Sequence, residues 1–240
     1  MVSNNNIIYI LYMYNNYVIN LERRKDRYDD FLKKCKKNNI KNIIRFNAFD
    51  KNNLKNKNGK IISDVIYTKY QTNIFKNFRN LQFGEIGCFL SHICLWEKQL
   101  LNNNEYIIIY EDDPIFCNNY ENKFNNIINK IDKIDTILYL GGRFKANFRM
   151  KRCINVCDNI VKYDYNKEWN SSDCDRGTYS YIINKNCSKL LLENLNNPKF
   201  FNIPIDHYMM NVLKKYKKDI YHVNPLIIYS IVNSPDSDIR

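Results

Sequence analysis

Apolar and polar positions follow one another along this chain in blocks that predict a succession of strands and helices. Short, nearly uninterrupted runs of apolar and β-branched residues are typical of buried strands. These runs fall at residues 17–21, 43–50, 106–110, 135–142, 177–183 and 220–230. Longer stretches place apolar residues along one side of a helix against a charged background. They fall at residues 22–40, 81–101, 119–131, 186–195 and 203–218.

The order of these elements predicts an α/β protein in which helices flank a mixed, mainly parallel sheet. The chain opens strand–helix–strand, which is how a nucleotide-binding layer begins. It has no internal repeat and no linker rich in proline, glycine or serine, so we expect a single domain over residues 1–240. Polar segments near residues 51–80 and 143–175 are expected to be irregular excursions from that domain.

Composition indicates a globular protein, because 45% of the residues are hydrophobic and 14% are aromatic. The formal net charge is +12. Such a charge suits a nucleic-acid or anionic-membrane surface. The lysines and arginines are scattered, however, and Asn, Lys, Ile and Tyr are all abundant, which favours biased coding over a nucleic-acid partner. Positive charge would also favour a phosphate-bearing substrate.

The cysteines and the first residues of the chain bear on its location. The chain has 8 cysteines but is large enough to fold without disulfides, so we expect them to be mostly reduced. Cys153 and Cys157 form a weak zinc pattern, because no second pair matches their spacing. The apolar patch at residues 7–14 lacks a positive flank, a cleavage site and the length to span a bilayer. We therefore expect a soluble, cytoplasmic protein, in the host cytoplasm if the chain is viral.

Three consecutive carboxylates, Glu111, Asp112 and Asp113, follow the buried run at residues 106–110. In an α/β sheet, ligands bind beyond the carboxyl ends of the strands. Adjacent like charges repel by about 1 to 4 kcal/mol per pair, and a divalent cation with oxygen ligands relieves that repulsion. Because alternate residues of an extended segment face the same way, Glu111 and Asp113 can share a metal, or Asp112 can be the principal ligand. Alternatively, one acid caps the next helix or pairs with a lysine.

The acids stand in a series of blocks that is similar to a known family. In chain order, the blocks are VINLERRKDR, GEIGCFLSHICLWE, IIIYEDDPIF, TILYLGG, GTYSYIINKNCSKLL and IPIDHYM. Together with NPLIIYS and a C-terminal SDI, they resemble glycosyltransferase family 25, which contains lipooligosaccharide and procollagen galactosyltransferases. The later blocks look closest to the collagen-modifying branch.

The resemblance implies a GT-A fold and the transfer of a sugar from a UDP-sugar with inversion at the anomeric carbon. It also implies a diphosphate bound through Mn²⁺ or Mg²⁺. Galactose is the first choice of sugar and glucose the second. Hydroxylysine in a collagen-like protein is the first choice of acceptor, and a saccharide is the second. A homodimer is left open.

The resemblance further implies roles for individual residues. The family's metal motif corresponds to Glu111, Asp112 and Asp113. The residues expected to contact the nucleotide are Asn20, Leu21, Arg24, Ala48, Phe49, Asp50, Ser91 and His92. The alternative for His92 is a core histidine bonded to a backbone carbonyl. Gly84 and Gly87 are expected to allow close helix packing, because no phosphate-loop pattern surrounds them.

An inverting transfer needs a general base that takes the proton of the acceptor hydroxyl. Asp206 is the first choice, because a position at the start of a helix favours its ionised form. The alternative for Asp206 is a plain capping acid, and His207, Asp173 and Asp175 are the other candidates for the base. Two further hypotheses remain. One is a basic polyanion-binding protein without catalysis, against which the acidic cluster argues. The other is a transferase scaffold that binds UDP without turnover.

Overall fold

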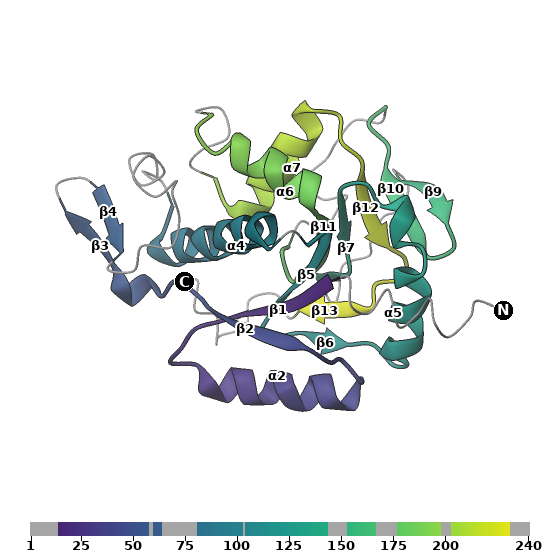
Figure 1. The fold of residues 1–240 in the computed structure, drawn as a ribbon, viewed down its shortest axis with the longest axis horizontal. Helices are drawn as coiled ribbons and strands as arrows, with labels where there is room; N and C mark the ends of the chain where they lie inside the picture. Colours follow the sequence, from purple (N-terminus) through teal and green to yellow (C-terminus); the bar gives the residue numbers. More distant parts are fainter. Residues whose placement is uncertain are drawn as a thin grey trace.

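The structure is a computed structural model that describes residues 14–57, 60–63, 81–102, 104–143, 153–166, 177–197 and 203–230. Its main feature is a sheet of eight strands in the order β2-β1-β5-β11-β7-β12-β10-β9, flanked by helices (Figure 1). The strands are β1 (Tyr14–Asn20), β2 (Ile43–Asn47), β5 (Tyr106–Glu111), β7 (Ile137–Tyr139), β9 (Cys153–Cys157), β10 (Ile160–Tyr163), β11 (Ser180–Asn184) and β12 (Ile220–Val223). The expected α/β class is confirmed.

The helices occur where apolar residues recur at helical spacing. They are α2 (Lys25–Lys37), α4 (Phe83–Leu101), α5 (Tyr120–Ile128), α6 (Lys185–Glu193) and α7 (Ile205–Lys215), with short 3₁₀ turns η1 (Lys51–Asn53) and η2 (Ile131–Lys133). α4 begins with a capping box in which the side chains of Gln82 and Glu85 each accept a hydrogen bond from the other residue's backbone N–H. The strand–helix–strand opening is confirmed, because β1 and β2 are parallel neighbours joined through α2.

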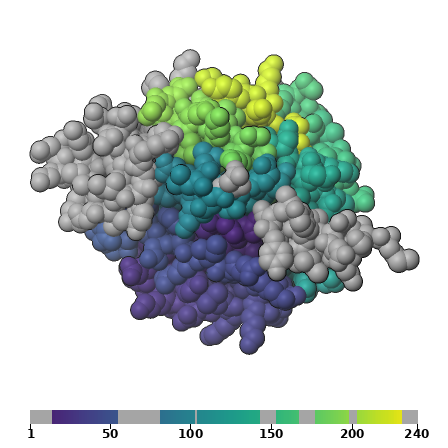
Figure 2. All heavy atoms as spheres, viewed as in Figure 1, coloured from purple at the N-terminus to yellow at the C-terminus, as the bar shows by residue number. Residues whose placement is uncertain are grey.

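Two hydrophobic clusters divide the helices between the two faces of the sheet. One cluster joins α4, α6 and α7 to the sheet, and the other joins α2 and α5 to its opposite face. In the space-filling view, β1, α2 and β2 (purple to blue) lie below α4 (teal), and α6 and α7 (green) lie above it (Figure 2). β5 contributes Ile107 and Ile109 to the first cluster and Ile108 and Tyr110 to the second. Alternate residues of β5 therefore face different helices.

The expectation of a mainly parallel sheet is wrong. Three of its neighbouring strand pairs are parallel, and four are antiparallel. β11 runs against both of its neighbours, β5 and β7. All five residues of β11 are buried. A strand buried on both faces has the same continuous apolar sequence whichever way it runs, so its direction cannot be read from the pattern.

The segment near residues 143–175 contains more regular structure than expected, because β9 and β10 pair with each other and extend the main sheet. A second sheet has the order β6-β13-β8. Its strands are β6 (Ile115–Phe116), β8 (Gly141–Arg143) and β13 (Ile228–Ser230). β3 (Leu54–Lys57) and β4 (Lys60–Ser63) form a separate hairpin. Among the helices of the described ranges, none combines the length and apolar character needed to cross a bilayer.

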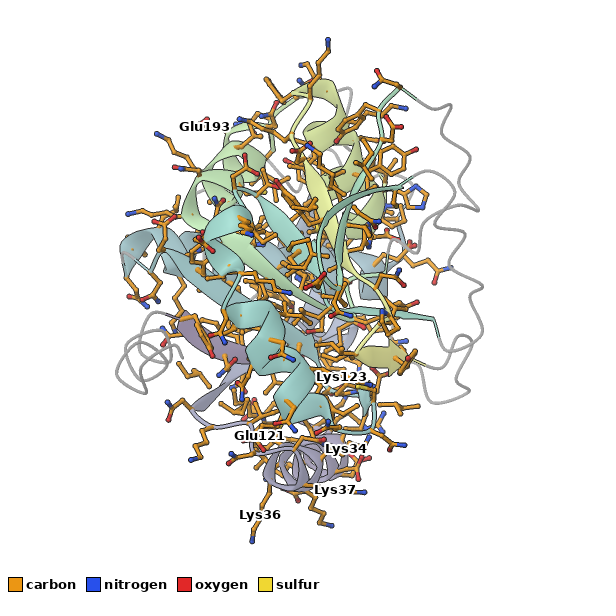
Figure 3. The ribbon with its side chains drawn as sticks, turned by 90° about the vertical axis from the view of Figure 1, so that its right-hand side faces the viewer. Lys34, Lys36, Lys37, Glu121, Lys123 and Glu193 are labelled. Carbon is orange, nitrogen blue, oxygen red and sulfur yellow. The ribbon has the colours of Figure 1, made fainter. Side chains whose placement is uncertain are left out.

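A group of lysines lies at the C-terminal end of α2. Lys34, Lys36 and Lys37 extend from the lower end of the molecule, near Glu121 and Lys123 of α5 (Figure 3). At 1.5 Å per residue they lie about 10 to 15 Å along α2 from its first turn. The main chain at that first turn adjoins the carboxyl end of β1, where the candidate site described below is built. These lysines therefore form a solvated helix end that is separate from that site.

Candidate active site

The three acids lie at the carboxyl end of β5, between its parallel neighbour β1 and its antiparallel neighbour β11. The alternation of β5 continues past the end of the strand. Glu111 follows Ile107 and Ile109 toward the α4 face, and Asp112 follows Ile108 and Tyr110 toward the α2 face. The contacts of the two carboxylates bear out this division.

On the α2 face, Asp112 has two side-chain partners. Its Oδ2 atom accepts a hydrogen bond of 2.5 Å from Asn20 Nδ2. Arg27 Nη2 lies 2.7 Å from Asp112 Oδ1 and 2.8 Å from Asp113 Oδ2, so one guanidinium bridges both acids. Burial raises the pKa of Asp112 above its ordinary value, while Arg27 and the Asn20 hydrogen bond act in the opposite direction.

Asn20 connects this carboxylate to the turn that follows β1. Its Nδ2 atom also donates to the carbonyl oxygen of Arg24 at 3.0 Å, and its Oδ1 atom accepts from Arg45 Nε at 3.0 Å. Arg45 donates as well to the carbonyl oxygen of Leu21 at 3.2 Å. The structure therefore brings the expected nucleoside residues Asn20, Leu21 and Arg24 together beside Asp112.

The exit of β2 is tied to β1 and α4. The Ala48 backbone N–H donates to the carbonyl oxygen of Asn20 at 3.0 Å. The Phe49 N–H donates to Ser91 Oγ at 3.1 Å, and Ser91 Oγ donates to the Gly87 carbonyl oxygen at 2.7 Å. A Cβ atom on Gly87 would lie 2.3 Å from the Phe49 carbonyl oxygen, so close packing requires glycine there. Ser91 is fully buried, and its hydroxyl joins two parts of the protein.

Asp50 lies at the outer end of the same segment. Its Oδ1 atom caps η1 by accepting from the Asn52 N–H at 3.0 Å, and its Oδ2 atom lies 2.6 Å from Arg23 Nε. Arg23 lies in the turn that follows β1, and Asn52 lies in η1, shortly after the end of β2. The residues expected to border the base or ribose, Ala48, Phe49 and Asp50, therefore follow the same sheet edge as Asn20.

On the α4 face, Glu111 has very different surroundings. Thr178 Oγ1 donates to Glu111 Oε1 at 2.7 Å. Cys88 Sγ, a ring nitrogen of His92 and a carboxylate oxygen of Glu111 all lie within 4.8 Å of one another. Desolvation, followed by the negative charge of Asp113, raises the pKa of Glu111 to about 8. Glu111 is therefore an acid whose charge the protein does not favour.

His92 is a core residue of α4 and is fully buried. Its Nδ1 atom lies 2.7 Å from the Tyr181 hydroxyl, which also accepts a hydrogen bond of 3.1 Å from Trp96 Nε1. Burial lowers the pKa of His92 to about 3, so the ring is neutral. His92 therefore has the buried position of a core histidine, but its hydrogen-bond partner is a tyrosine hydroxyl and not the backbone carbonyl expected for that alternative.

Asp206 and His207 lie in the first turn of α7, as expected. Asp206 Oδ1 accepts from the His207 backbone N–H at 2.8 Å. Besides burial, the charges of Glu111, Asp206 and Glu85 raise the pKa of the Cys88 thiol, which places the start of α7 within electrostatic range of the Glu111 side. Asp173 and Asp175 lie outside the described residues.

Three residues at this site were absent from the sequence-based hypotheses: Arg27, Cys88 and Thr178. Cys88 could have been found, because it stands four residues before His92 and side chains at that spacing share a helix face. Arg27 could have been suspected from its position in the first turn after β1. Thr178 reaches Glu111 only because β11 runs antiparallel beside β5, and no local pattern predicts that pairing.

The acids fit a hard divalent cation. All three offer carboxylate oxygens, which are the donors that Mg²⁺ and Mn²⁺ prefer. The negative charge of Asp113 repels the ionised carboxylate of Glu111 and so contributes to its raised pKa. A bound cation would offset that repulsion. Alternation assigns Glu111 and Asp113 to one side of the strand end. Asn20 and Arg27 engage Asp112, and Arg27 also pairs with Asp113.

The sequence is similar to parts of several known proteins. Procollagen galactosyltransferase 2 of Homo sapiens is 26% identical over 228 residues, which cover 89% of this chain and 34% of that protein. The lipooligosaccharide biosynthesis protein lex-1 of Haemophilus influenzae is 30% identical over 157 residues, covering 62% of this chain and 50% of that protein. A procollagen lysyl hydroxylase and glycosyltransferase of Acanthamoeba polyphaga mimivirus is 34% identical over 140 residues, covering 52% and 14%.

The chain thus spans about a third of the length of the procollagen galactosyltransferase that it matches. The sequence model of glycosyltransferase family 25 (LPS biosynthesis protein) matches residues 13–209, from the start of β1 into α7. That range includes the acids of β5, the Cys88–His92 face of α4 and Asp206. This chain belongs to glycosyltransferase family 25.

Proposed function

We propose that this chain is an inverting glycosyltransferase of the GT-A type that transfers a sugar from a UDP-sugar to an acceptor hydroxyl. The observation that carries the proposal is the arrangement at the end of β5. Two carboxylates face different helices there. Asp112 is held by Arg27 and Asn20, and Glu111 faces α4 beside Cys88, a thiol whose pKa the charge of Asp206 raises. In a chain of this family, such a strand end suits a nucleoside diphosphate and a cation.

Glu111 and Asp113, with Asp112 behind them, would hold Mn²⁺ or Mg²⁺, which supplies positive charge to the diphosphate leaving group. Arg27 keeps Asp112 and Asp113 in fixed positions. Asn20, Leu21 and Arg24 would bind the nucleoside. The exit of β2, residues 48–50, would border the base or ribose, with Ser91 and His92 supporting it from α4 rather than through direct contact.

The transfer itself requires a base on the acceptor side. Asp206 would accept the proton of the acceptor hydroxyl while that oxygen forms a bond to the anomeric carbon. The bond from the anomeric carbon to the diphosphate oxygen breaks as UDP leaves, and the configuration inverts. Asp206 suits this role because the N-terminus of α7 favours its anionic form. His207 and Asp173 are the alternatives.

For the donor we propose galactose first and glucose second, and for the acceptor a hydroxylysine in a collagen-like chain. The procollagen galactosyltransferase and the mimivirus lysyl hydroxylase and glycosyltransferase support this choice by their names. A saccharide acceptor is the second candidate, because lex-1 is a lipooligosaccharide biosynthesis protein.

The test is release of UDP in Mn²⁺ from UDP-galactose, UDP-glucose and UDP-N-acetylglucosamine. Each donor is incubated with a hydroxylysine peptide, with a saccharide acceptor, or with neither. We expect acceptor-dependent release that is greatest with UDP-galactose and the peptide. UDP binding without release from any pair would favour a scaffold without turnover. Tight, salt-sensitive binding of generic DNA without UDP binding would favour a polyanion-binding protein.

A further inference from the structure

Cys88 and His92 form a second set of candidate ligands beside the three acids. They stand four residues apart on α4 and point to one side of it. His92 Nδ1 is engaged by the Tyr181 hydroxyl. His92 Nε2 is buried and has no hydrogen-bond partner among the described residues. Buried polar atoms without a partner are uncommon and call for an explanation. A ring nitrogen of His92 lies within 4.8 Å of both Cys88 Sγ and Glu111, and Nε2 is the one left to act as a ligand.

The surrounding residues orient two of the three groups, His92 and Glu111. The contact of Tyr181 with Nδ1 fixes the imidazole ring, and Trp96 in turn fixes the Tyr181 hydroxyl. Thr178 Oγ1 donates a hydrogen bond to Glu111 Oε1 at 2.7 Å. Partners of this kind, which orient a ligand side chain from outside the site, are typical of metal sites in proteins.

The chemistry of the set differs from that of the neighbouring acids. A thiolate, an imidazole and a carboxylate are ligands of Zn²⁺, whereas Mn²⁺ and Mg²⁺ prefer oxygen donors. In tetrahedral Zn²⁺ sites the bond lengths place ligand atoms about 3.4 to 3.6 Å apart. Because the observed separations are all within 4.8 Å, the side chains need to approach by no more than about 1.4 Å to reach those spacings. Three protein ligands also leave a fourth position for a water molecule or a substrate oxygen.

We propose that Cys88, His92 and Glu111 form a site for a thiophilic divalent cation of the Zn²⁺ class, and that this site shares Glu111 with the oxygen-ligand cluster. A cation held by Cys88 and His92 takes Glu111 away from Asp113. Zn²⁺ and Mn²⁺ then compete for one carboxylate, and Zn²⁺ inhibits the enzyme. The competition rests on the proposed function, but the binding of the thiophilic cation does not.

Binding is tested with Co²⁺ on the metal-free chain of residues 1–240, because Co²⁺ bound to a thiolate gives a charge-transfer absorption. We expect a band that saturates at one equivalent and is bleached by Zn²⁺. Cys88→Ser should remove the band. Cys94→Ser is the matched control, because Cys94 is also buried in α4 but lies outside the cluster, and it should retain the band. Absence of the band in the native chain, or its persistence in Cys88→Ser, would overturn the proposal.

A second measurement covers the case in which Cys88→Ser fails to fold. The native chain is alkylated with and without Co²⁺, and the modified cysteines are located by peptide mass. We expect Co²⁺ to protect Cys88 and to leave Cys117 unaffected. Co²⁺ binding that leaves Cys88 as reactive as before would overturn the site.

Competition is tested in the UDP-release assay. We expect excess Mn²⁺ to relieve inhibition by Zn²⁺, and Cys88→Ser to need at least ten times more Zn²⁺ for half-inhibition. Equal sensitivity of the two proteins to Zn²⁺ would overturn the shared-ligand proposal. The two failures are distinguishable: a cobalt band without UDP release counts against the transferase alone, and UDP release without a cobalt band counts against the zinc site alone.

Discussion

Asp112 and Glu111, on the two sides of the β5 strand end, are carboxylates with different surroundings. On the α2 side, Asp112 receives a hydrogen bond from Asn20 and an ion pair from Arg27. On the α4 side, the strongest influences on Glu111 are desolvation and the charge of Asp113, and both oppose ionisation. Two adjacent residues at the end of β5 thus supply one carboxylate with two protein partners and one carboxylate whose ionisation a cation would favour. Under the proposed function, the Glu111 side is therefore where a cation would complete the site.

The largest effect is expected where the two sides meet, at Asp113. Asp113→Ala removes one carboxylate of the proposed cation site and an ion-pair partner of Arg27. Metal charge contributes several kcal/mol to the transition state, so we expect about a 1,000-fold loss of Mn²⁺-dependent UDP release without unfolding. The control is Asp158→Ala, because that side chain is 97% exposed. Full Mn²⁺-dependent activity in Asp113→Ala would exclude Asp113 as a ligand.

Asp206 tests whether the Glu111 side also receives the acceptor. Asp206→Asn keeps the shape of the side chain but cannot take a proton. We expect transfer to fall about 100-fold or more while UDP binding is unchanged, as measured by UDP release and by calorimetry. Glu193→Gln, on the exposed surface of α6, is the control. If His207→Gln lost more activity than Asp206→Asn, the base would be His207.

Arg27 is the test of the Asp112 side. Arg27→Met keeps the length of the side chain but leaves a buried carboxylate without its ion pair. We expect the free energy of unfolding in urea to fall by about 2 kcal/mol without metal, and by less in Mn²⁺. The matched control on the same helix is Lys34→Met, which breaks an exposed ion pair with Asp30 and should cost about 0.5 kcal/mol or less.

An equal cost for Arg27→Met and Lys34→Met would remove the distinction between the two sides. It would mean that Asp112 is solvated well enough to need no partner. Measuring Arg27→Met with and without Mn²⁺ distinguishes a further case. If Mn²⁺ does not reduce the loss of unfolding free energy, the role of Arg27 is in folding alone.

How much the sequence predicts depends on whether a feature is local. The strand–helix–strand opening follows from residues 14–47, where apolar runs and helical spacing are unambiguous. The position of the acids follows from one strand and its end. The direction of β11 does not follow, because pairing partners distant in sequence set it. The strands β9 and β10 were missed because Asn155 interrupts the apolar run of β9 and Lys162 interrupts that of β10.

The same reasoning applies to the candidate site. Alternation along β5 was sufficient to separate Glu111 from Asp112. The partners that give the two acids different properties could not be derived, because Arg27, Cys88 and Thr178 come from three elements that meet only in the folded chain. Asp173 and Asp175 lie outside the described residues, and their roles stay predictions.

Substitution of Thr178 should have the smallest effect of these variants. It tests how much the Glu111 side depends on its own hydrogen-bond partner. Thr178→Val keeps the shape of the side chain but removes the hydroxyl that donates to Glu111 Oε1. We expect the free energy of unfolding to fall by about 1 kcal/mol, because the lost hydrogen bond is a single one and Glu111 has an unfavourable charge to begin with. Thr178→Ser retains the hydroxyl and should stay within about 0.5 kcal/mol of the native chain. Both values come from urea unfolding without metal. A loss in Thr178→Val as large as that in Arg27→Met would mean that the Glu111 side relies on its protein partners as strongly as the Asp112 side does.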